Sequence, residues 1–332
     1  MHKDRMTIWN RTELAAGLGA RDGLPKIDLA NNSGNDFVAS GFSIDSRTIQ
    51  QGDIFLPLQG GARDGHEFIP NVLENGAAAS FCHINQWKKY SAMAMTKGKL
   101  IASNDIIADL TLLARYRRDQ IKSNRGENPT IVGITGSVGK TSTKEMLGVV
   151  LASYAERLAK KMKAAAQQLF YISPANQNNT LGVPLCLVNT PATIHYGIYE
   201  AGMNHKGELA AIGQTLRPDI GVITNIYENH IGHFADINAI AEAKYELIDS
   251  VAAGGTAILN CDSGFFEEHS KKFIKKKKGI VISFGASKEA DIYLDLISDV
   301  KLVQTKFFDR SVHYKLGALG EHQVINSLAI LA

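Results

Sequence analysis

Residues 131–147 read IVGITGSVGKTSTKEML, and this stretch decides the fold. A β-branched run at 131–135 enters a glycine-rich turn that ends in Gly-Lys-Thr at 139–141, and a helix-forming segment follows at once. A phosphate-binding loop requires this order, because the glycines let backbone N–H groups face anionic oxygens and the helix adds its positive N-terminal end. The strict consensus has glycine five residues before Gly139, where this chain has Ile134, which disfavours a motor ATPase or GTPase. The stretch therefore predicts a nucleoside triphosphate site.

The loop assigns roles to its own residues. Lys140 is expected to reach the terminal phosphates, and Thr141 to offer its hydroxyl to Mg²⁺. The other nucleotide contacts expected in the loop are Thr135, Gly136, Ser137 and Gly139. A glycine-rich turn with a chance lysine is the alternative, and the agreement of loop, lysine, threonine and flanking elements weighs against it.

Composition narrows the class of protein. At 332 residues the chain is long enough for two domains, and 45% hydrophobic with 21% charged residues suits a globular protein with a proper core. The 36 basic and 33 acidic residues leave a net charge of +3, which is no argument for a nucleic-acid partner. Three widely spaced cysteines predict neither disulfides nor zinc. No apolar run is long enough for membrane insertion, so a cytoplasmic protein is expected.

The polar segment 122–129 is the best linker and divides the chain into an N-terminal α/β domain, 1–124, and a central domain, 125–332. In the first domain strands are expected at 41–44 and 52–58, and helices at 68–75 and 106–122. In the second, strands are expected at 130–135, 197–200, 219–224, 256–259 and 279–284. Helical stretches separate most of these strands, which predicts a mostly parallel sheet flanked by helices.

Ligands on such sheets bind at the carboxyl ends of the strands, and Glu200, Asn225 and His230 each lie at or just past a strand end. Glu200 follows an apolar run and reads either as a metal ligand or as a solvated strand end. His230 taken alone reads as a structural or surface histidine.

The helix that begins near Asp236 carries Lys244 on its apolar face. An unpaired lysine there is costly, so the ammonium either reaches water along its stem or is chemically altered or bound at the active site. His322 and Asn326 stand four apart on a C-terminal helix, where both could touch one ligand edge. Residues 154–170 read as a surface helix, and 271–278 as a solvated helix face.

The N-terminal domain holds two short polar segments, Asp45-Ser46-Arg47 and residues 60–66. A hydroxyl, a guanidinium and a glycine-rich backbone could together hold a pyrophosphate, with Arg47 as a bidentate partner. Taken alone they are more typical of turns and a surface arginine.

Together and in this order, these segments resemble the Mur ligases of peptidoglycan synthesis, over nearly the whole chain. The residues that carry the resemblance are SIDSR at 43–47, DGHEF at 64–68, the phosphate loop, NNTLGVPL at 178–185, EAGMNHKGE at 200–208, TNI at 224–226 with His230, Ala243-Lys244, and His322 with Asn326. The segments at 178–185 and 200–208 are similar to the branch that adds D-alanyl-D-alanine to UDP-N-acetylmuramoyl-tripeptide.

The resemblance implies a UDP-sugar-binding α/β domain followed by a P-loop-type ATP-binding domain, with the family's C-terminal acceptor domain missing. It implies ATP and two Mg²⁺ ions, with Thr141, Glu200, His230 and a carbamoylated Lys244 as metal ligands. Lys140, Glu200, His230 and Lys244 would be the catalytic set. Asn225, His322 and Asn326 would contact nucleotide, and Ser46, Arg47, Asp64, His66, Asn178 and Asn179 would contact substrate.

The implied reaction is ATP-dependent amide formation through an acyl phosphate, with UDP-N-acetylmuramoyl-tripeptide and D-alanyl-D-alanine as partners. A monomer is expected, and the 332-residue chain alone is expected to bind nucleotide weakly and to ligate poorly or not at all. The alternatives are another Mur ligase adding a single amino acid, an enzyme like folylpolyglutamate synthase, a non-catalytic fragment that binds nucleotide or UDP-sugar, and a P-loop kinase or GTPase.

Overall fold

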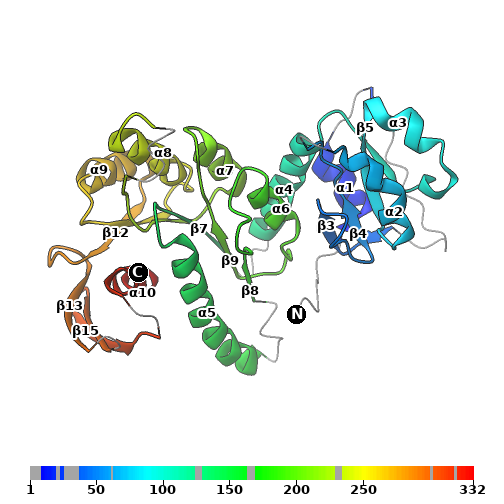
Figure 1. Cartoon of the computed structure of the whole chain (residues 1–332). Helices are drawn as coiled ribbons and strands as arrows, with labels where there is room; N and C mark the ends of the chain where they lie inside the picture. Colours follow the sequence, from blue (N-terminus) through cyan, green and yellow to red (C-terminus); the bar gives the residue numbers. More distant parts are fainter. Residues whose placement is uncertain are drawn as a thin grey trace. The chain divides into compact units, whose positions relative to one another are not determined.

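The computed structural model describes residues 9–19, 23–25, 37–60, 63–123, 129–162, 169–228, 234–299, 302–317 and 320–332, and at 158–162 and 296–299 it describes the backbone only. Internal contacts divide the chain into two compact units (Figure 1). The first contains residues 1–124 and 184–193, and the second contains 125–183 and 194–332. Residues 184–193 belong with the first unit, a placement that no break in the sequence pattern indicates.

The first unit is built on a four-stranded parallel sheet in the order β3 (Gly41–Ser43), β4 (Asp53–Phe55), β5 (Ala79–His83) and β6 (Leu100–Ser103). Strands β1 (Trp9–Asn10) and β2 (Val38–Ala39) form a separate antiparallel pair. The helices are α1 (Arg11–Leu18), α2 (Ile69–Glu74), α3 (Ile84–Ser91) and α4 (Ile106–Ser123), with 3₁₀ turns η1 (Gly65–Phe68) and η2 (Ala94–Thr96). The expected strands and helices are present, although β3 and β4 are shorter than the predicted runs.

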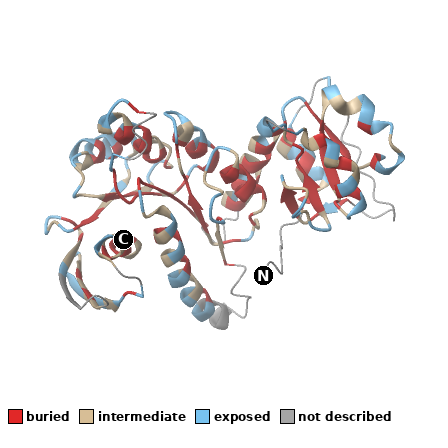
Figure 2. Ribbon diagram, viewed as in Figure 1, coloured by how far each residue is buried: buried red, intermediate tan, exposed pale blue. Residues whose placement is uncertain are grey.

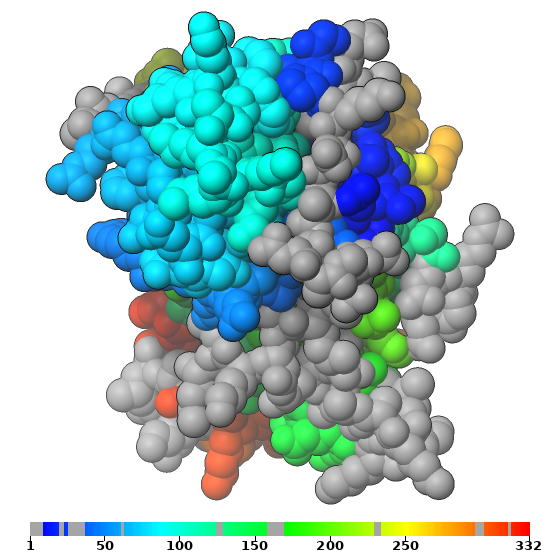
Figure 3. Space-filling view, turned by 90° about the vertical axis from the view of Figure 1, so that its right-hand side faces the viewer, coloured from blue at the N-terminus to red at the C-terminus, as the bar shows by residue number. Residues whose placement is uncertain are grey.

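The core of this unit forms where α2 and α3 cover the sheet. It joins apolar side chains of β4, β5 and β6 to those of the two helices, among them Phe55, Ile69, Val72, Cys82, Tyr90 and Leu100. Figure 2 shows the buried residues concentrated in the strands and on the helix faces toward them. Figure 3 shows residues of this unit, coloured blue to cyan, over much of the surface in view.

The second unit is built on a nine-stranded sheet in the order β15-β14-β13-β12-β11-β10-β7-β9-β8. Its parallel part consists of β7 (Thr130–Thr135), β8 (Phe170–Ile172), β9 (Tyr196–Glu200), β10 (Ile220–Ile223), β11 (Thr256–Asn260), β12 (Ile280–Gly285) and β13 (Ile292–Asp299). Strands β14 (Leu302–Phe307) and β15 (Arg310–Lys315) continue it antiparallel. The predicted, mostly parallel sheet is confirmed, and the antiparallel extension is an addition to it.

Helices cover both faces of the parallel strands. Helices α7 (Glu208–Leu216), α8 (Ile237–Asp249) and α9 (Phe266–Lys277) lie on one face, and α5 (Lys140–Met162) and α10 (Glu321–Leu331) on the other (Figure 1). Helix α6 (Gly182–Val188) connects the two units. The sheet core contains Val132, Ile134, Ile198, Val222, Ile258, Phe284, Ile292 and Leu328.

The prediction of one surface helix over 154–170 is wrong at its end. Helix α5 reaches Met162, residues 163–168 lie outside the described part, and Phe170 begins the edge strand β8. The aromatic and β-branched residues of β8 pair with β9, and this pairing outweighs the helix-forming composition before it. On α9 the predicted solvated helix face is confirmed, because Lys271 is exposed and its Nζ lies 3.1 Å from Oε2 of exposed Glu267. None of the helices that the structure describes is both long and apolar enough to cross a membrane.

Candidate functional site

The strand register of the second unit brings its candidate residues to one edge. Strand β7 lies between β9 and β10, with Ile134 paired to Glu200 and Thr135 paired to Ile223. The carboxyl ends of these parallel strands therefore meet, and the phosphate loop, Glu200 and the residues after β10 share one end of the sheet.

The loop conformation depends on two glycines. Gly136 has φ 151° and Gly139 has φ 84°, in the region that favours glycine. A Cβ on Gly136 would collide with Thr224 Oγ1, and a Cβ on Gly139 would collide with the side-chain amide of Asn326. The backbone thus approaches β10 and α10 more closely than any other residue would allow.

Residues after β10 hold the loop in place. Asn225 Oδ1 accepts from Val138 N at 2.9 Å, and Asn225 Nδ2 donates to Val138 O at 3.0 Å. Thr224 Oγ1 also donates to Val138 O, at 2.7 Å. The carboxamide of Asn225 therefore holds the loop in this structure, whereas the sequence suggested a nucleotide contact. The sequence reasoning gave Thr224 no role, although it is part of the TNI segment at 224–226 that carries the resemblance.

Lys140 lies over the loop that precedes it. Its Nζ donates to Gly136 O at 2.8 Å and to Ser137 O at 3.3 Å. Burial lowers the pKa of this ammonium, and the nearby Glu200 carboxylate opposes the shift. The structure therefore places this charge beside the loop, and the predicted contact with the terminal phosphates stays a prediction.

Glu200 is the acidic group of the site and is only 2% exposed. Its Oε2 accepts from Thr141 Oγ1 at 2.9 Å, and its Oε1 accepts from Asn178 Nδ2 at 2.8 Å. The solvated strand end considered from the sequence is wrong, because the carboxylate is buried and held from two sides. A carboxylate and a hydroxyl are hard oxygen donors, so this pair fits Mg²⁺.

Lys244 lies on the buried face of α8 and is 3% exposed. Burial, together with the positive charge of Lys140, lowers the pKa of its amine to about 7. The lysine therefore does not reach water along its stem, and near neutral pH a large fraction is the uncharged amine.

The buried face of α10 meets the loop at Asn326. This residue is 2% exposed, and in the part of the chain that the structure describes its Nδ2 has no hydrogen-bond partner. Thr135 Oγ1, at the end of β7, has none there either. Unsatisfied buried polar atoms are rare without a ligand or water, so their place beside the loop fits a nucleotide. His322 is exposed at the start of the same helix.

The structure gives the predicted substrate contacts Asn178 and Asn179 different partners. Asn179 Oδ1 accepts from Leu181 N at 3.1 Å and from Gly182 N at 2.7 Å, which caps the start of α6, whereas Asn178 reaches Glu200. His230 lies outside the described residues. Within those residues, no group of three or more His, Cys, Asp or Glu side chains is placed to hold a metal.

The first unit contains a separate cavity of about 630 Å³. Its lining includes Ser46, Arg47, Phe55, Leu58, Arg63 and Phe68. The Arg47 guanidinium makes two bonds to Asp45, Nε–Oδ1 at 2.9 Å and Nη2–Oδ2 at 2.7 Å, and the Arg47 side chain is 86% exposed. These bonds lower the pKa of Asp45 to about 2. The two guanidinium donors of Arg47 that were predicted to bind a pyrophosphate are thus bonded to Asp45 in this structure.

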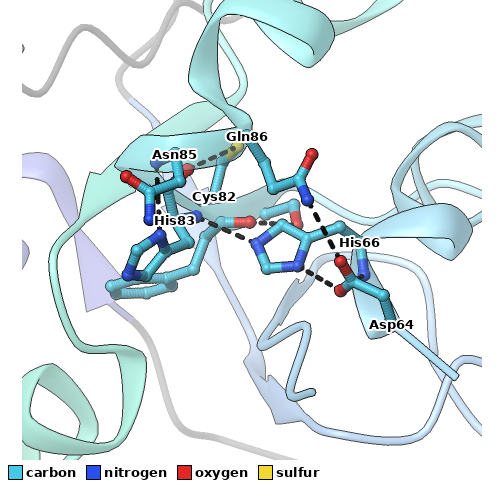
Figure 4. A network of polar contacts seen from close by, with 8 residues as sticks. Asp64, His66, Cys82, His83, Asn85 and Gln86 are labelled. Carbon is cyan, nitrogen blue, oxygen red and sulfur yellow. Dashed lines mark hydrogen bonds and ion pairs between the residues drawn. The ribbon is translucent and has the colours of Figure 1, made fainter. Parts of the chain in front are cut away.

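The loop beside this cavity is fixed by a histidine network (Figure 4). His66 is 1% exposed; its Nδ1 lies 2.6 Å from Asp64 Oδ1, and its Nε2 accepts from His83 N at 3.0 Å. Gln86 Nε2 donates to the other Asp64 oxygen at 3.2 Å. Both ring nitrogens of His66 are therefore used within the protein, so the residue positions the loop, and only Asp64 keeps an exposed edge.

Comparison with known proteins finds similarity to Mur ligases in family models and in individual sequences. The Mur ligase middle domain matches residues 134–332, and the Mur ligase family catalytic domain matches 38–128. The UDP-N-acetylmuramoyl-tripeptide--D-alanyl-D-alanine ligase of Rickettsia prowazekii is 30% identical over 314 residues, which cover 92% of this chain and 62% of that protein. The protein of the same name from Bacillus subtilis is 28% identical over 315 residues, covering 92% and 61%.

Solved structures agree. A crystal structure of MurF from Acinetobacter baumannii superposes with a TM-score of 0.76 at 27% identity, covering 98% of this chain and 64% of that one. MurF from Thermotoga maritima in complex with ADP superposes with a TM-score of 0.66 at 25% identity, covering 88% and 61%. The chain thus spans less than two thirds of the length of these relatives.

The fold and the loop site define an α/β protein with a phosphate-type loop at the carboxyl end of a parallel sheet. The middle-domain match alone covers more than half of the chain, and the catalytic-domain match covers most of the first unit. The chain belongs to the Mur ligase family.

Proposed function

We propose that this chain supplies the UDP-sugar-binding and ATP-binding units of a ligase that joins D-alanyl-D-alanine to UDP-N-acetylmuramoyl-tripeptide. The observation that carries the proposal is the buried Glu200, held by Thr141 and Asn178 against the phosphate loop. The names of the R. prowazekii and B. subtilis relatives support the choice of substrates.

A carboxylate does not react with an amine at neutral pH, so the carboxylate of the tripeptide must first be activated. A carboxylate oxygen of the tripeptide attacks the γ-phosphorus of ATP, the bond to the β-phosphate oxygen breaks, and ADP leaves. The dipeptide amine then attacks the acyl carbon, a C–N bond forms, phosphate leaves and the nitrogen loses a proton. The first step places negative charge on the phosphoryl oxygens, where positioned cations stabilise it.

Lys140 is the cation that the chain itself supplies. In the bound state its Nζ would exchange the carbonyls of Gly136 and Ser137 for the β- and γ-phosphate oxygens. Thr135 Oγ1 and the loop N–H groups would complete the phosphate site, and Asn326 Nδ2 would bond the adenine. His322, exposed on the same helix, would reach the base from its edge.

Magnesium would be held by Thr141 and Glu200, and when bound it would neutralise charge on the phosphates. Two ions are expected, with His230 as a further ligand. Lys244 joins this set as a carbamate: its uncharged amine attacks CO₂, an N–C bond forms and a proton is released to solvent. The desolvated site and the pKa near 7 favour that reaction, and the product is an anionic oxygen ligand close to Lys140.

The cavity of the first unit would hold the UDP end of the donor. Ser46 would donate to it directly, and Arg47 would bind the diphosphate after exchanging Asp45. Asp64 and His66 would act through the loop that they fix, with Asp64 available for a direct contact. Asn178 and Asn179 would place the segment that faces the donor carboxylate.

The proposal includes a cytoplasmic, monomeric protein. All three cysteines, Cys82, Cys186 and Cys261, are free, which suits a reducing compartment. A cytoplasmic reaction also has ATP at hand.

Hydroxylamine trapping tests the function without the dipeptide acceptor. The chain is mixed with ATP, Mg²⁺, hydroxylamine and one of two donors, UDP-N-acetylmuramoyl-tripeptide or UDP-N-acetylmuramoyl-dipeptide. Hydroxamates are measured by mass spectrometry. We expect the hydroxamate of the tripeptide, and none from Lys140→Ala. A hydroxamate formed only from the UDP-N-acetylmuramoyl-dipeptide donor would instead identify a ligase that adds a single amino acid. The absence of a hydroxamate with either donor would contradict the proposal.

A further inference from the structure

A second lysine lies one helical turn beyond Lys140 and is completely buried. The Lys144 side chain is 0% exposed on the face of α5 toward β8 and β9. Its Nζ donates to Ser173 O at 2.8 Å and lies 3.7 Å from Glu200 Oε2. A buried ammonium is costly unless it is paired and hydrogen-bonded, so these partners must explain its presence.

Glu200 is the partner that shares the interior with Lys144. Glu145 Oε1 is also near, at 3.3 Å, but the Glu145 side chain is 62% exposed and its charge is screened by water. The Glu200 side chain is 3% exposed. Because attraction between charges grows as water is excluded, the pair with Glu200 is the stronger one.

Ser173 connects the two charged residues. Its carbonyl accepts from Lys144 Nζ, and its hydroxyl accepts from Glu200 N at 3.1 Å. The residue lies just after β8, the neighbour of β9 in the sheet, and is itself buried. One short segment thus fixes both the lysine head and the backbone that carries the carboxylate.

The two lysines of α5 have different surroundings. Lys140 Nζ bonds carbonyls of the phosphate loop, where phosphates would take their place, while Lys144 Nζ bonds Ser173 O and lies beside Glu200. Lys144 is too enclosed to meet a nucleotide, and its only buried charged partner among the described residues is Glu200.

We propose that Lys144 is a positioning residue for magnesium. It holds the Glu200 carboxylate in one orientation, with Oε2 toward Thr141, so that the two oxygen donors are in place before the ion arrives. The inference rests on the proposed function in that Glu200 is taken as a magnesium ligand. It predicts that Lys144 affects nucleotide binding only through the metal.

The test is calorimetric ADP binding with and without saturating Mg²⁺, on the wild type and on Lys144→Met, Glu200→Gln and the double variant. For Lys144→Met we expect ADP affinity without metal to stay within about twofold, because the loop is intact. The gain in ADP affinity on adding Mg²⁺ should fall about tenfold or more, the usual effect of removing the group that orients a metal ligand. The double variant should lose no more than Glu200→Gln alone.

Lys271→Met is the matched control, because it removes a lysine from an exposed ion pair and should change neither affinity. If Lys144→Met leaves a buried carboxylate that prevents folding, the double variant should fold, since its neutral amide no longer needs a cation. The inference would be overturned if Mg²⁺ raised the ADP affinity of Lys144→Met as much as that of the wild type. It would also be overturned if the double variant lost more of this gain than Glu200→Gln, or if neither Lys144→Met nor the double variant folded. Absence of any Mg²⁺ gain in the wild type would instead overturn the proposed metal site itself.

Discussion

At the phosphate loop the charged groups are buried and held by neighbouring strands, whereas in the cavity of the first unit the ion pair of Asp45 and Arg47 stands in solvent. Glu200 and Lys144 are almost fully covered, while the Arg47 side chain is 86% exposed. A buried charge needs fixed partners and keeps its geometry, and an exposed pair can exchange partners at little cost. The loop site is therefore built before its ligand arrives, and the cavity is completed by its ligand.

The largest effect should come from the loop lysine. Lys140→Ala should reduce acyl-phosphate formation by roughly 100- to 1000-fold, the size expected when one preorganised charge-stabilising group is lost. Arg47→Ala should instead weaken donor binding and leave the rate at saturating donor unchanged. Hydroxamate yields measured against donor concentration separate these effects, and equal losses in both variants would remove the distinction between the sites.

A stability measurement tests whether Lys244 is an unmodified, desolvated amine when CO₂ is excluded. Its folded-state pKa of about 7 lies below the ordinary lysine value of 10.5, so the folded state binds fewer protons between these values. The resulting cost is complete below pH 7 and disappears as the pH rises through 10.5. Lys244→Met should therefore raise Tm by roughly 5 °C at pH 7 in CO₂-free buffer, and by less at pH 9.5.

Exposed Lys275 provides the control for this comparison, since Lys275→Met removes a lysine without relieving burial. An equal Tm gain at both pH values would show that the cost of Lys244 is not its charge. A fall in Tm for Lys244→Met would show that the amine is already paired.

The histidine network of the first unit should give an effect of intermediate size. His66→Ala leaves His83 N and Asp64 without their partner, which costs about 1–3 kcal/mol of local stability. Hydrogen exchange at the His83 amide should accelerate accordingly. His205→Ala is the matched control, because His205 lies 3.3 Å from Glu208 in an exposed pair and should leave that amide unchanged. Unchanged exchange in His66→Ala would mean that the loop is held by its backbone alone.

The smallest effect should come from the exposed pair. Arg47→Ala should move the pKa of Asp45 from about 2 toward its ordinary value of 3.8, because two hydrogen bonds from the guanidinium hold it down. A lowered carboxyl pKa stabilises above pH 3.8 and loses that contribution as the pH falls through about 2. An NMR titration of the Asp45 carboxyl measures this shift, and a midpoint unchanged by the substitution would show that the pair does not form in solution.

The sequence could predict what depends on neighbours along the chain. The glycine-rich loop between strand and helix, the parallel strands and the place of Lys244 on the apolar face of α8 follow from local order and periodicity, and all are present. Roles set by distant contacts could not be predicted: Asn225 binds the loop, both nitrogens of His66 are used within the protein, and Lys144 meets Glu200 across two strands.

The strands that the sequence did not predict also depend on contacts with other parts of the chain. The sequence reading assigned no strand to residues 292–315, where β13, β14 and β15 pair with one another. The edge strand β8 likewise depends on β9.

The most direct test follows a labelled oxygen. UDP-N-acetylmuramoyl-tripeptide carrying ¹⁸O in its terminal carboxylate is incubated with the chain, ATP, Mg²⁺ and hydroxylamine, and the released phosphate is analysed by mass spectrometry. An acyl phosphate requires one carboxylate oxygen to leave with the phosphorus, so we expect one ¹⁸O per phosphate. Phosphate without ¹⁸O, formed alongside ADP, would mean that water attacks ATP, and it would contradict ligase chemistry at this site.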